Sequence, residues 1–352
     1  MSRRDIYYWK CDRPAAFHGT RGHGAAAETG PALRAALQEH FHTRDVTLRP
    51  GAGQGNHLTW LADVDGRALF LRVEDGPEGD THLAAESAVL DAVRACGVPT
   101  PRVFGCDATR TRVSFAWQAL ERVDAPDLNQ WFKDGALDTH AAAYEIGAAV
   151  ARWQSAPVTG FGPLDAGLRG CHAAYPAYFH LRLERHLTFL VERRFLSRAR
   201  ADEFAAAIAE HGALLDLEKG CLVHKDLALW NILGTAREIR AFIDFDDAIS
   251  GDAMDDLSLL GCFHDAAFVA RAIEGYQSLR ALPAESARRF WLHLLRNMIV
   301  KAVIRVGAGY FERDAGFFLI QNGGGSALRE RTLERLALAL RGLREDAPLS
   351  LL

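Results

Sequence analysis

The sequence predicts an α+β fold with two lobes, a small β-rich lobe followed by a larger, mostly α-helical lobe. The chain has 352 residues, and at roughly 100 to 200 residues per domain this is enough for two lobes that share one cleft. Short apolar segments separated by Gly, Asp and Pro fill residues 46–123, whereas helical periodicity prevails over residues 124–352. Residues 1–45 are expected to form an N-terminal extension packed on the small lobe.

Charge and composition exclude several classes of protein. The 41 Lys and Arg residues against 45 Asp and Glu residues give a formal net charge of -4, which creates no strong field toward nucleic acid or an anionic membrane. The six cysteines form no C-x-x-C pair, as is typical of reduced thiols. The N-terminus is charged where a signal peptide needs an apolar region, and no run of about 18 apolar residues occurs. We expect a cytoplasmic protein without nucleic-acid or membrane partners, of undetermined oligomeric state.

The small lobe contains predicted strands and one predicted helix. Apolar segments predict strands at residues 59–64, 68–73 and 112–120. The helix is expected over residues 81–96, with Asp80 as its N-cap and Gly97 as its stop signal.

The large lobe is expected to be helical except around one polar loop. Apolar residues spaced by three and four positions predict helices, namely Ile146, Val150 and Trp153, and then Phe179, Leu183, Leu187 and Leu190. Within residues 221–246, two short apolar runs at 221–223 and 239–243 flank a polar loop. Helical periodicity then returns, with a loop expected at residues 323–325.

This polar loop carries the residues that phosphoryl transfer needs. Asp226 is followed by Asn231 five positions later, and Asp244 stands at the end of the next apolar run. Asp226 can accept the proton of an incoming hydroxyl, while Asn231 and Asp244 offer hard oxygen ligands to Mg²⁺. Each residue alone is more simply a turn, cap or strand-end residue. Together, between apolar strands, they predict a phosphotransferase site.

Three parts of the sequence resemble the aminoglycoside phosphotransferase and choline kinase-like family. They are the segment from His224 to Asn231, the residue Asp244, and the run Gly251-Asp252-Ala253-Met254-Asp255-Asp256-Leu257. The resemblance covers roughly residues 46–260 and implies a protein kinase-like fold, with a nucleotide-binding N-lobe (46–123) and a catalytic, substrate-binding C-lobe (124–352). It also implies that Asp226 is the catalytic base, that Asn231 and Asp244 hold the metal, and that Asp256 orders the catalytic loop.

Three features of the small lobe are candidates for nucleotide binding. Gly53 and Gly55 lie in a glycine-rich stretch that could approach phosphates, although a hairpin turn explains the glycines equally well. The backbone of Gln118 to Leu120 is expected to form the hinge that contacts an adenine edge. Glu86 falls on the apolar face of its predicted helix and therefore needs a cation.

Arg72 is the expected partner of Glu86. In the resembled family a Lys at this strand pairs with the Glu and contacts the α and β phosphates, so the Arg is a departure. Arg72 either performs the work of that Lys or forms a simple ion pair in a pseudokinase.

Lys225 is a second departure, because the family commonly has Gly between the His and the Asp. Its ammonium either stabilises the transferred phosphoryl group, which would make it catalytic, or points to solvent.

The sequence therefore predicts Mg²⁺-dependent transfer of the γ-phosphoryl of ATP, or of GTP, to a hydroxyl of a small molecule. Aminoglycoside, choline-like, sugar and amino-alcohol acceptors all remain open. The alternative is a pseudokinase, a non-catalytic nucleotide-binding or scaffolding protein. The pair Asp244 and Asp246 also resembles the opening of haloacid dehalogenase-type phosphatases, but that reading needs a doubly wound domain and leaves Asp226 and Asn231 without a purpose.

Overall fold

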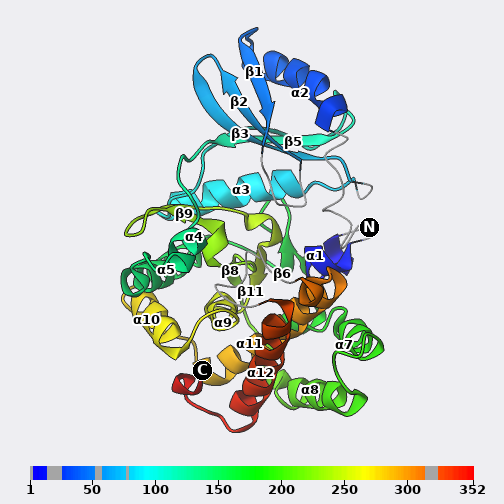
Figure 1. The fold of residues 1–352 in the computed structure, drawn as a ribbon, viewed down its shortest axis with the longest axis vertical. Helices are drawn as coiled ribbons and strands as arrows, with labels where there is room; N and C mark the ends of the chain where they lie inside the picture. The colour runs from blue at the N-terminus through cyan, green and yellow to red at the C-terminus, as the bar shows by residue number, and fades with distance from the viewer. Residues whose placement is uncertain (1–2, 14–25, 52–57, 77–78, 314–323) are drawn as a thin grey trace.

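The computed structural model describes residues 3–13, 26–51, 58–76, 79–313 and 324–352. These residues form two lobes, a small one built around a sheet and a large one made mostly of helices (Figure 1). The predicted two-lobe α+β fold is confirmed. Among the helices described, none is long and apolar enough to cross a membrane.

The core of the small lobe is a five-stranded antiparallel sheet with the strand order β1-β2-β3-β5-β4. The strands are β1 (Val46–Pro50), β2 (Leu58–Val64), β3 (Arg67–Glu74), β4 (Val103–Asp107) and β5 (Ala116–Glu121). The strand predicted from residue 112 begins only at Ala116. Strand β4 is not among the predicted strands, because it is short and contains Gly105.

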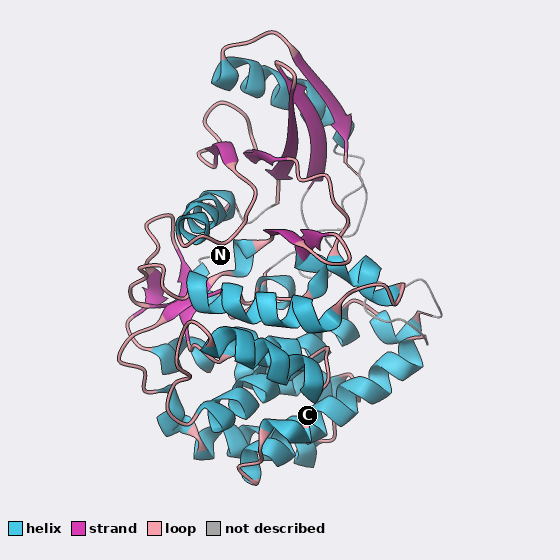
Figure 2. Cartoon of the chain, turned by 90° about the vertical axis from the view of Figure 1, so that its left-hand side faces the viewer, coloured by secondary structure: helices cyan, strands magenta, loops and turns pink. Residues whose placement is uncertain are grey.

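Two helices cover the two faces of this sheet (Figure 2). Helix α2 (Ala26–Phe41) packs Leu33 and Leu37 against the face that carries Leu69 and Leu71 of β3. Helix α3 (His82–Ala95) packs against β4 and β5 on the other side. Because side chains alternate along a strand, Arg72 of β3 points toward α3. The N-cap of α3 is Thr81 instead of the predicted Asp80, whose carboxylate accepts the main-chain N–H of His82 at 3.0 Å.

Long helices form most of the large lobe. Helices α5 (Thr139–Trp153) and α10 (Ala266–Gln277) approach so closely that a Cβ at Gly147 or Gly275 would collide with the main chain of the other helix. Helix α11 (Ser286–Gly307) crosses the centre of the lobe. The other helices are α4 (Leu128–Lys133), α6 (Tyr175–Phe179), α7 (Leu183–Glu192), α8 (Arg198–Glu210), α9 (Asp255–Gly261) and α12 (Gly325–Arg344). The apolar stripe from residue 179 to residue 190 thus spans two helices, α6 and α7, since Arg182 between them is left-handed, with φ 61°.

Short strands of the large lobe hold the polar loop. Strand β8 (Cys221–Val223) belongs to a four-stranded sheet with β6 (Phe161–Leu164), β7 (Gly170–His172) and β11 (Ile249–Gly251). Strands β9 (Ile232–Gly234) and β10 (Ile239–Phe242) form a separate antiparallel pair. Asp226 and Asn231 lie between β8 and β9, and Asp244 follows β10.

The N-terminal residues differ from the prediction. Helix α2 packs on the small lobe as expected, but residues 3–13, which include α1 (Trp9–Asp12), lie mainly against the large lobe. The ring of Tyr7 stacks on Tyr178 at 4.8 Å, and the Tyr178 hydroxyl donates to the Tyr7 carbonyl at 2.9 Å. The apolar run from Ile6 to Trp9 is buried, and the larger lobe offers the apolar surface that such a run requires. We call residues 3–13 the N-terminal segment.

Candidate active site

The loop from residue 224 to residue 231, here called the catalytic loop, is fixed by Asp256 at the start of α9. The carboxylate of Asp256 accepts the main-chain N–H of His224 at 2.8 Å, that of Lys225 at 3.0 Å and the indole N–H of Trp153 at 3.2 Å. Burial raises the pKa of Asp256 to about 6 in spite of these donors. The loop is also joined to the end of β10, because His224 Nε2 donates to the Ile243 carbonyl at 2.9 Å. These contacts agree with the ordering role expected for Asp256.

Asp226 is buried between two ammonium groups. Lys301 Nζ lies 2.7 Å from its Oδ1, and Lys10 Nζ lies 2.6 Å from its Oδ2. Asn231 Nδ2 donates to the Asp226 carbonyl at 2.8 Å and to Oδ2 at 3.2 Å. Burial alone would raise the pKa of Asp226, but the two lysines outweigh it and hold the pKa well below its ordinary value. Asp226 is therefore ionised throughout the neutral pH range.

Lys10 and Lys301 are missing from the residues predicted by sequence. Lys10 is in the N-terminal segment, where the sequence carries no readable pattern. Lys301 had a usable signal, because His293, Asn297 and Lys301 recur every four positions on helix α11. Such spacing places polar groups on one face of a helix.

Arg72 and Glu86 meet as expected, and Arg72 also reaches the metal-site candidate. Arg72 Nη1 lies 2.5 Å from both oxygens of Glu86, while Nη2 lies 3.1 Å from Asp244 Oδ1 and 3.0 Å from Asp246 Oδ2. Burial would lower the pKa of Arg72, but the three carboxylates raise it further above its already high value. One guanidinium thus faces three carboxylates. The guanidinium joins the small lobe to the end of β10.

The donor set around Asp244 fits a hard divalent cation. Asp244 adopts the left-handed conformation, with φ 65°, directly after β10, and its side chain is 28% exposed. The Ile243 N–H donates to the Asn231 carbonyl at 3.0 Å, so the two candidate ligands belong to neighbouring segments. Because Asn231 uses its amide nitrogen on Asp226, its amide oxygen is left for a metal ion. Carboxylate and amide oxygens are ligands that Mg²⁺ prefers. The three carboxylates of Glu86, Asp244 and Asp246 outnumber the single guanidinium that they face, and this excess of negative charge favours a cation.

The other small-lobe residues predicted to bind a nucleotide lie in the glycine-rich stretch and in β5. Gly53 and Gly55 lie outside the described residues. Gln118 and Leu120 belong to β5, which has β3 on one side and β4 on the other. Their main-chain groups therefore face other strands, and the Gln118 side chain donates to Ser87 Oγ at 2.9 Å. The prediction that the main chain of Gln118 to Leu120 forms the hinge that contacts an adenine edge is therefore wrong, since the chain leaves the sheet only after Glu121.

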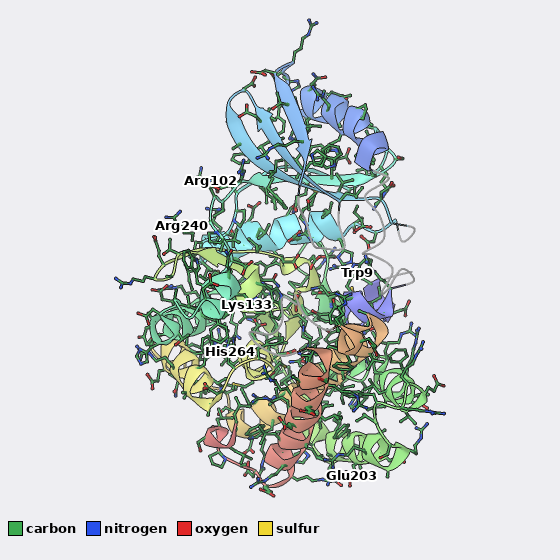
Figure 3. The ribbon with its side chains drawn as sticks, viewed as in Figure 1. Trp9, Arg102, Lys133, Glu203, Arg240 and His264 are labelled. Carbon is green, nitrogen blue, oxygen red and sulfur yellow. The ribbon has the colours of Figure 1, made fainter. Side chains whose placement is uncertain are left out.

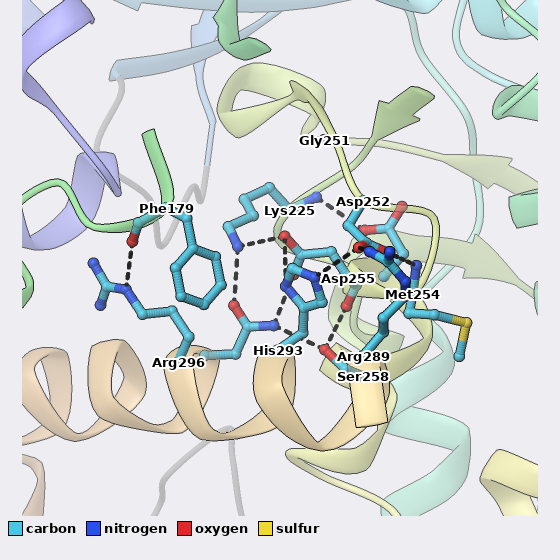
Figure 4. A network of polar contacts seen from close by, with 12 residues as sticks. Phe179, Lys225, Gly251, Asp252, Met254, Asp255, Ser258, Arg289, His293 and Arg296 are labelled. Carbon is cyan, nitrogen blue, oxygen red and sulfur yellow. Dashed lines mark hydrogen bonds and ion pairs between the residues drawn. The ribbon is translucent and has the colours of Figure 1, made fainter. Parts of the chain in front are cut away.

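Lys225 takes neither of the two orientations expected from the sequence. Its ammonium group is buried in the large lobe, 2.7 Å from Asp255 Oδ2 (Figure 4). It also lies 3.0 Å from Asn297 Oδ1 and 3.1 Å from the Tyr7 hydroxyl. These three contacts use the three N–H donors of the group. Lys225 therefore cannot also bind a phosphoryl group, and we assign it a structural role instead of the predicted catalytic one. Its backbone is left-handed, with φ 71°.

A second cluster of possible metal ligands, Cys11, Asp12 and His186, lies in the large lobe. His186 Nε2 lies 2.8 Å from Asp12 Oδ1, while the Arg296 guanidinium lies 3.1 Å from Nδ1. Burial raises the pKa of the Cys11 thiol well above its ordinary value. A protonated thiol beside a guanidinium is a poor cation site, so we interpret this cluster as structural.

Comparison with known proteins agrees with this geometry. Residues 47–291 match the model of the phosphotransferase enzyme family, the same family that the catalytic loop resembles. The match covers more than half of the chain, and the chain belongs to this family. No curated protein matches the chain.

Solved structures of phosphotransferases share the fold. Aminoglycoside phosphotransferase APH(4)-Ia is similar with a TM-score of 0.64 and 16% identity, over 89% of this chain and 99% of that chain. A thermostable variant of APH(4)-Ia in ternary complex with AMP-PNP and hygromycin B has a TM-score of 0.63 and 17% identity, over 88% of this chain and 98% of that chain. The macrolide 2'-phosphotransferase MphH from Brachybacterium faecium has a TM-score of 0.54 and 16% identity, over 88% of this chain and 98% of that chain. At these identities, the likeness is one of fold.

Proposed function

We propose that this phosphotransferase moves the γ-phosphoryl group of ATP, or of GTP, to a hydroxyl of a small molecule with the help of Mg²⁺. The observation that carries the proposal is a chain of contacts: Asn231 bonds to Asp226 and accepts the N–H of Ile243 next to Asp244, and Arg72 joins Asp244 to Glu86. These are the groups that position a nucleotide, its metal and an acceptor. Binding of AMP-PNP by the APH(4)-Ia variant supports a nucleotide as donor.

Each residue then has a role in the proposal. Asn231 and Asp244 hold Mg²⁺, which neutralises phosphate charge when it is bound. Arg72 contacts the α and β phosphates, and the chain just after Glu121 contacts the base of the nucleotide. Asp226 orients the acceptor hydroxyl. Its low pKa makes it a weak base, but a loose phosphoryl-transfer transition state requires little proton abstraction before the phosphorus–oxygen bond breaks.

The proposal assigns residues 46–123 to nucleotide binding and residues 124–352 to catalysis and acceptor binding. A cytoplasmic location is part of it, because ATP and reduced thiols coexist there, and all six cysteines are free.

A pseudokinase is the second candidate. It is favoured by Arg72 in place of the usual Lys and by Lys10, which occupies Asp226 Oδ2. An active enzyme requires that Lys10 yields part of this contact to the acceptor.

Thermal unfolding tests the proposal. The wild type and Asp244→Ala are heated with ATP, with GTP or without nucleotide, each with and without Mg²⁺. A ligand at about 100 times its dissociation constant adds roughly 2.7 kcal/mol, which raises the melting temperature by a few degrees. We expect a Mg²⁺-dependent shift that Asp244→Ala abolishes and that Asp202→Ala, an exposed control on α8, retains.

Hydrolysis of ATP then separates the two candidates. Slow release of ADP by the wild type, lost in Asp226→Asn, supports an enzyme. A nucleotide-induced shift without any ADP release, with a broad panel of hydroxyl compounds present, supports the pseudokinase. No shift with any nucleotide contradicts the enzyme and supports a pseudokinase that acts as a scaffold.

A further inference from the structure

A cavity of about 290 Å³ opens beside the catalytic loop, between α4, α9, α11 and α12. Its wall combines aromatic and cationic side chains, chiefly Phe132, Trp230, Phe263, Arg305, Arg331 and Arg335. The phosphotransfer residues described above do not line it.

The cavity adjoins Asp226. Trp230 belongs to the catalytic loop, and its ring lies 4.8 Å from the ring of Phe263. Lys301 Nζ lies 5.8 Å from the centroid of Phe263 and 2.7 Å from Asp226 Oδ1. Arg305 follows Lys301 by four residues on α11, a rise of about 6 Å. The side chain of Lys301 thus links the cavity wall to the carboxylate of Asp226, which does not itself line the cavity.

Two of the cavity's cations, Arg305 and Arg335, make their hydrogen bonds to neutral oxygens. Arg305 is 5% exposed and donates from Nη1 to Thr332 Oγ1 at 2.8 Å, and Arg335 donates to the main-chain oxygen of Leu352 at 3.3 Å. Neither forms an ion pair with a carboxylate of the residues that the structure describes. Burial lowers the pKa of Arg305 to about 10, so that the group stays charged at neutral pH.

A buried cation without a counter-ion is costly, and an anion brought in by a ligand removes that cost. The carboxylate of Glu334 is also on the wall, but it is exposed. The net charge around Asp226 is positive as well, because two ammonium groups face one carboxylate. A polycation placed from the cavity to Asp226 would meet three arginines of the wall and the two lysines at Asp226.

We propose that this cavity binds the acceptor and that the acceptor is an anionic hydroxyl compound with an apolar or planar body. Its carboxylate or phosphate group lies at Arg305 and Arg335, its body packs on Trp230 and Phe263, and its hydroxyl reaches Asp226. The inference rests on the proposed function. In the transfer, the hydroxyl oxygen bonds to the γ-phosphorus while the bond from that phosphorus to the bridging oxygen breaks. ADP leaves, and the hydroxyl proton passes to Asp226 and then to solvent.

Matched probes test the charge preference. We would measure binding of 4-(hydroxymethyl)benzoate, benzyl alcohol and 4-(hydroxymethyl)benzylamine to the full chain by calorimetry. These probes share a planar body and a primary hydroxyl and differ in charge. The benzoate is expected to bind about 10- to 100-fold more tightly than the amine, the range of a charge-assisted hydrogen bond. Equal binding of the two charged probes, or no binding of the benzoate, overturns the inference.

Two variants on α12 locate the effect. Arg335→Gln is expected to weaken benzoate binding about tenfold or more and to leave benzyl alcohol unchanged. Arg341→Gln is the matched control, because Arg341 is exposed on the same helix and pairs with Glu345 at 3.0 Å. An equal loss in both variants, or in neither, contradicts the assigned place of the anion. Arg335 is preferred to the buried Arg305, whose replacement endangers folding.

The outcome is separable from that of the proposed function. A Mg²⁺-nucleotide shift without benzoate preference defeats only the anionic acceptor site. Benzoate preference without any nucleotide effect leaves the anion site in place and defeats the phosphotransferase proposal.

Discussion

At the scale of single residues, the site is built on unusual backbone conformations. Lys225 and Asp244 have positive φ angles of 71° and 65°. Side chains other than Asn and Asp seldom adopt such angles, so the conformation is most unusual for Lys225. Each such position costs about 1 kcal/mol and persists only where neighbouring contacts determine it. At Lys225 those contacts are the main-chain hydrogen bond to Asp256 and the ammonium contacts to Asp255, Asn297 and Tyr7.

Two opposing effects decide what Lys225→Gly does. Glycine removes about 1 kcal/mol of left-handed strain, but it leaves the buried carboxylate of Asp255 without its ammonium partner, which costs about 3 to 5 kcal/mol. We expect the free energy of unfolding, measured in urea, to fall by about 2 to 4 kcal/mol. Lys225→Met keeps the strain, so its free energy of unfolding should fall by more than that of Lys225→Gly.

Surface variant Arg288→Gln, on α11, is the control, since exposed ion pairs contribute about 1 kcal/mol or less. Unchanged stability of Lys225→Gly would mean that loss of the pair with Asp255 costs only about 1 kcal/mol, the amount of strain that glycine removes.

The sequence could identify the site residues that lie close together along the chain. Asp226, Asn231 and Asp244 could be predicted because metal and phosphate chemistry requires these residue types. The pair of Arg72 and Glu86 could be predicted because Glu86 places a charge on the apolar face of a helix. The lysines that bind Asp226 come from 216 residues before and 75 residues after it. No local pattern reports such a contact.

At the scale of elements, α11 connects the parts of the large lobe. His293, Asn297, Lys301 and Arg305 recur every four positions on this 22-residue helix, and all four are buried. Their contacts go to different elements: α9, the catalytic loop and α12. Periodicity predicts the helix, but a polar stripe normally indicates a solvated face. Here other buried polar groups take the place of water.

His264, just after α9, makes this part of the lobe sensitive to pH. Its ring stacks on Phe268 at 3.9 Å and lies among the side chains below Lys133 (Figure 3). Burial lowers the pKa of His264 to about 4, with Asp265 opposing and Arg335 adding to the shift. Since the unfolded residue has a pKa of about 6.5, below that pH the unfolded chain binds a proton that the folded chain refuses. Stability therefore falls as the pH falls.

From pH 7.5 to pH 5.5 the share of His264 in this loss is about 1 kcal/mol. We expect His264→Phe to reduce the pH dependence of the free energy of unfolding by that amount, as measured by urea titrations at both pH values. His140→Gln, at an exposed histidine of α5, should leave the dependence unchanged. An unaltered slope in His264→Phe would show that the ring is protonated in the folded state.

At the scale of the whole molecule, the two lobes and their boundary are predictable because strand and helix periodicities change along the chain. The position of the N-terminal segment is not predictable, because an apolar run of four residues indicates that it is buried but does not indicate which surface it packs against. In the structure it contacts both lobes. Trp9 packs on His82 of α3 at 4.1 Å, and Asp12 pairs with His186 of α7 at 2.8 Å.

Asp12 holds this segment to the large lobe, so Asp12→Ala should release it. The carboxylate also accepts the main-chain N–H groups of Tyr7 and Tyr8, each at 3.0 Å. Burial alone would raise the pKa of Asp12, but His186 and the Tyr8 N–H outweigh it and lower the pKa. The stabilisation is therefore fully present above the unfolded pKa of about 4 and is lost as the pH falls through the folded value.

We expect Asp12→Ala to lower the free energy of unfolding at pH 7 by about 3 kcal/mol, because three buried donors lose their acceptor. Amide hydrogen exchange should accelerate in residues 3–13 and at the start of α3, while α10 stays protected. Asp202→Ala, at an exposed residue of α8, should change neither quantity. If exchange accelerates in the N-terminal segment alone, the segment does not join the lobes, and its contacts with His82 contribute nothing to their relative position.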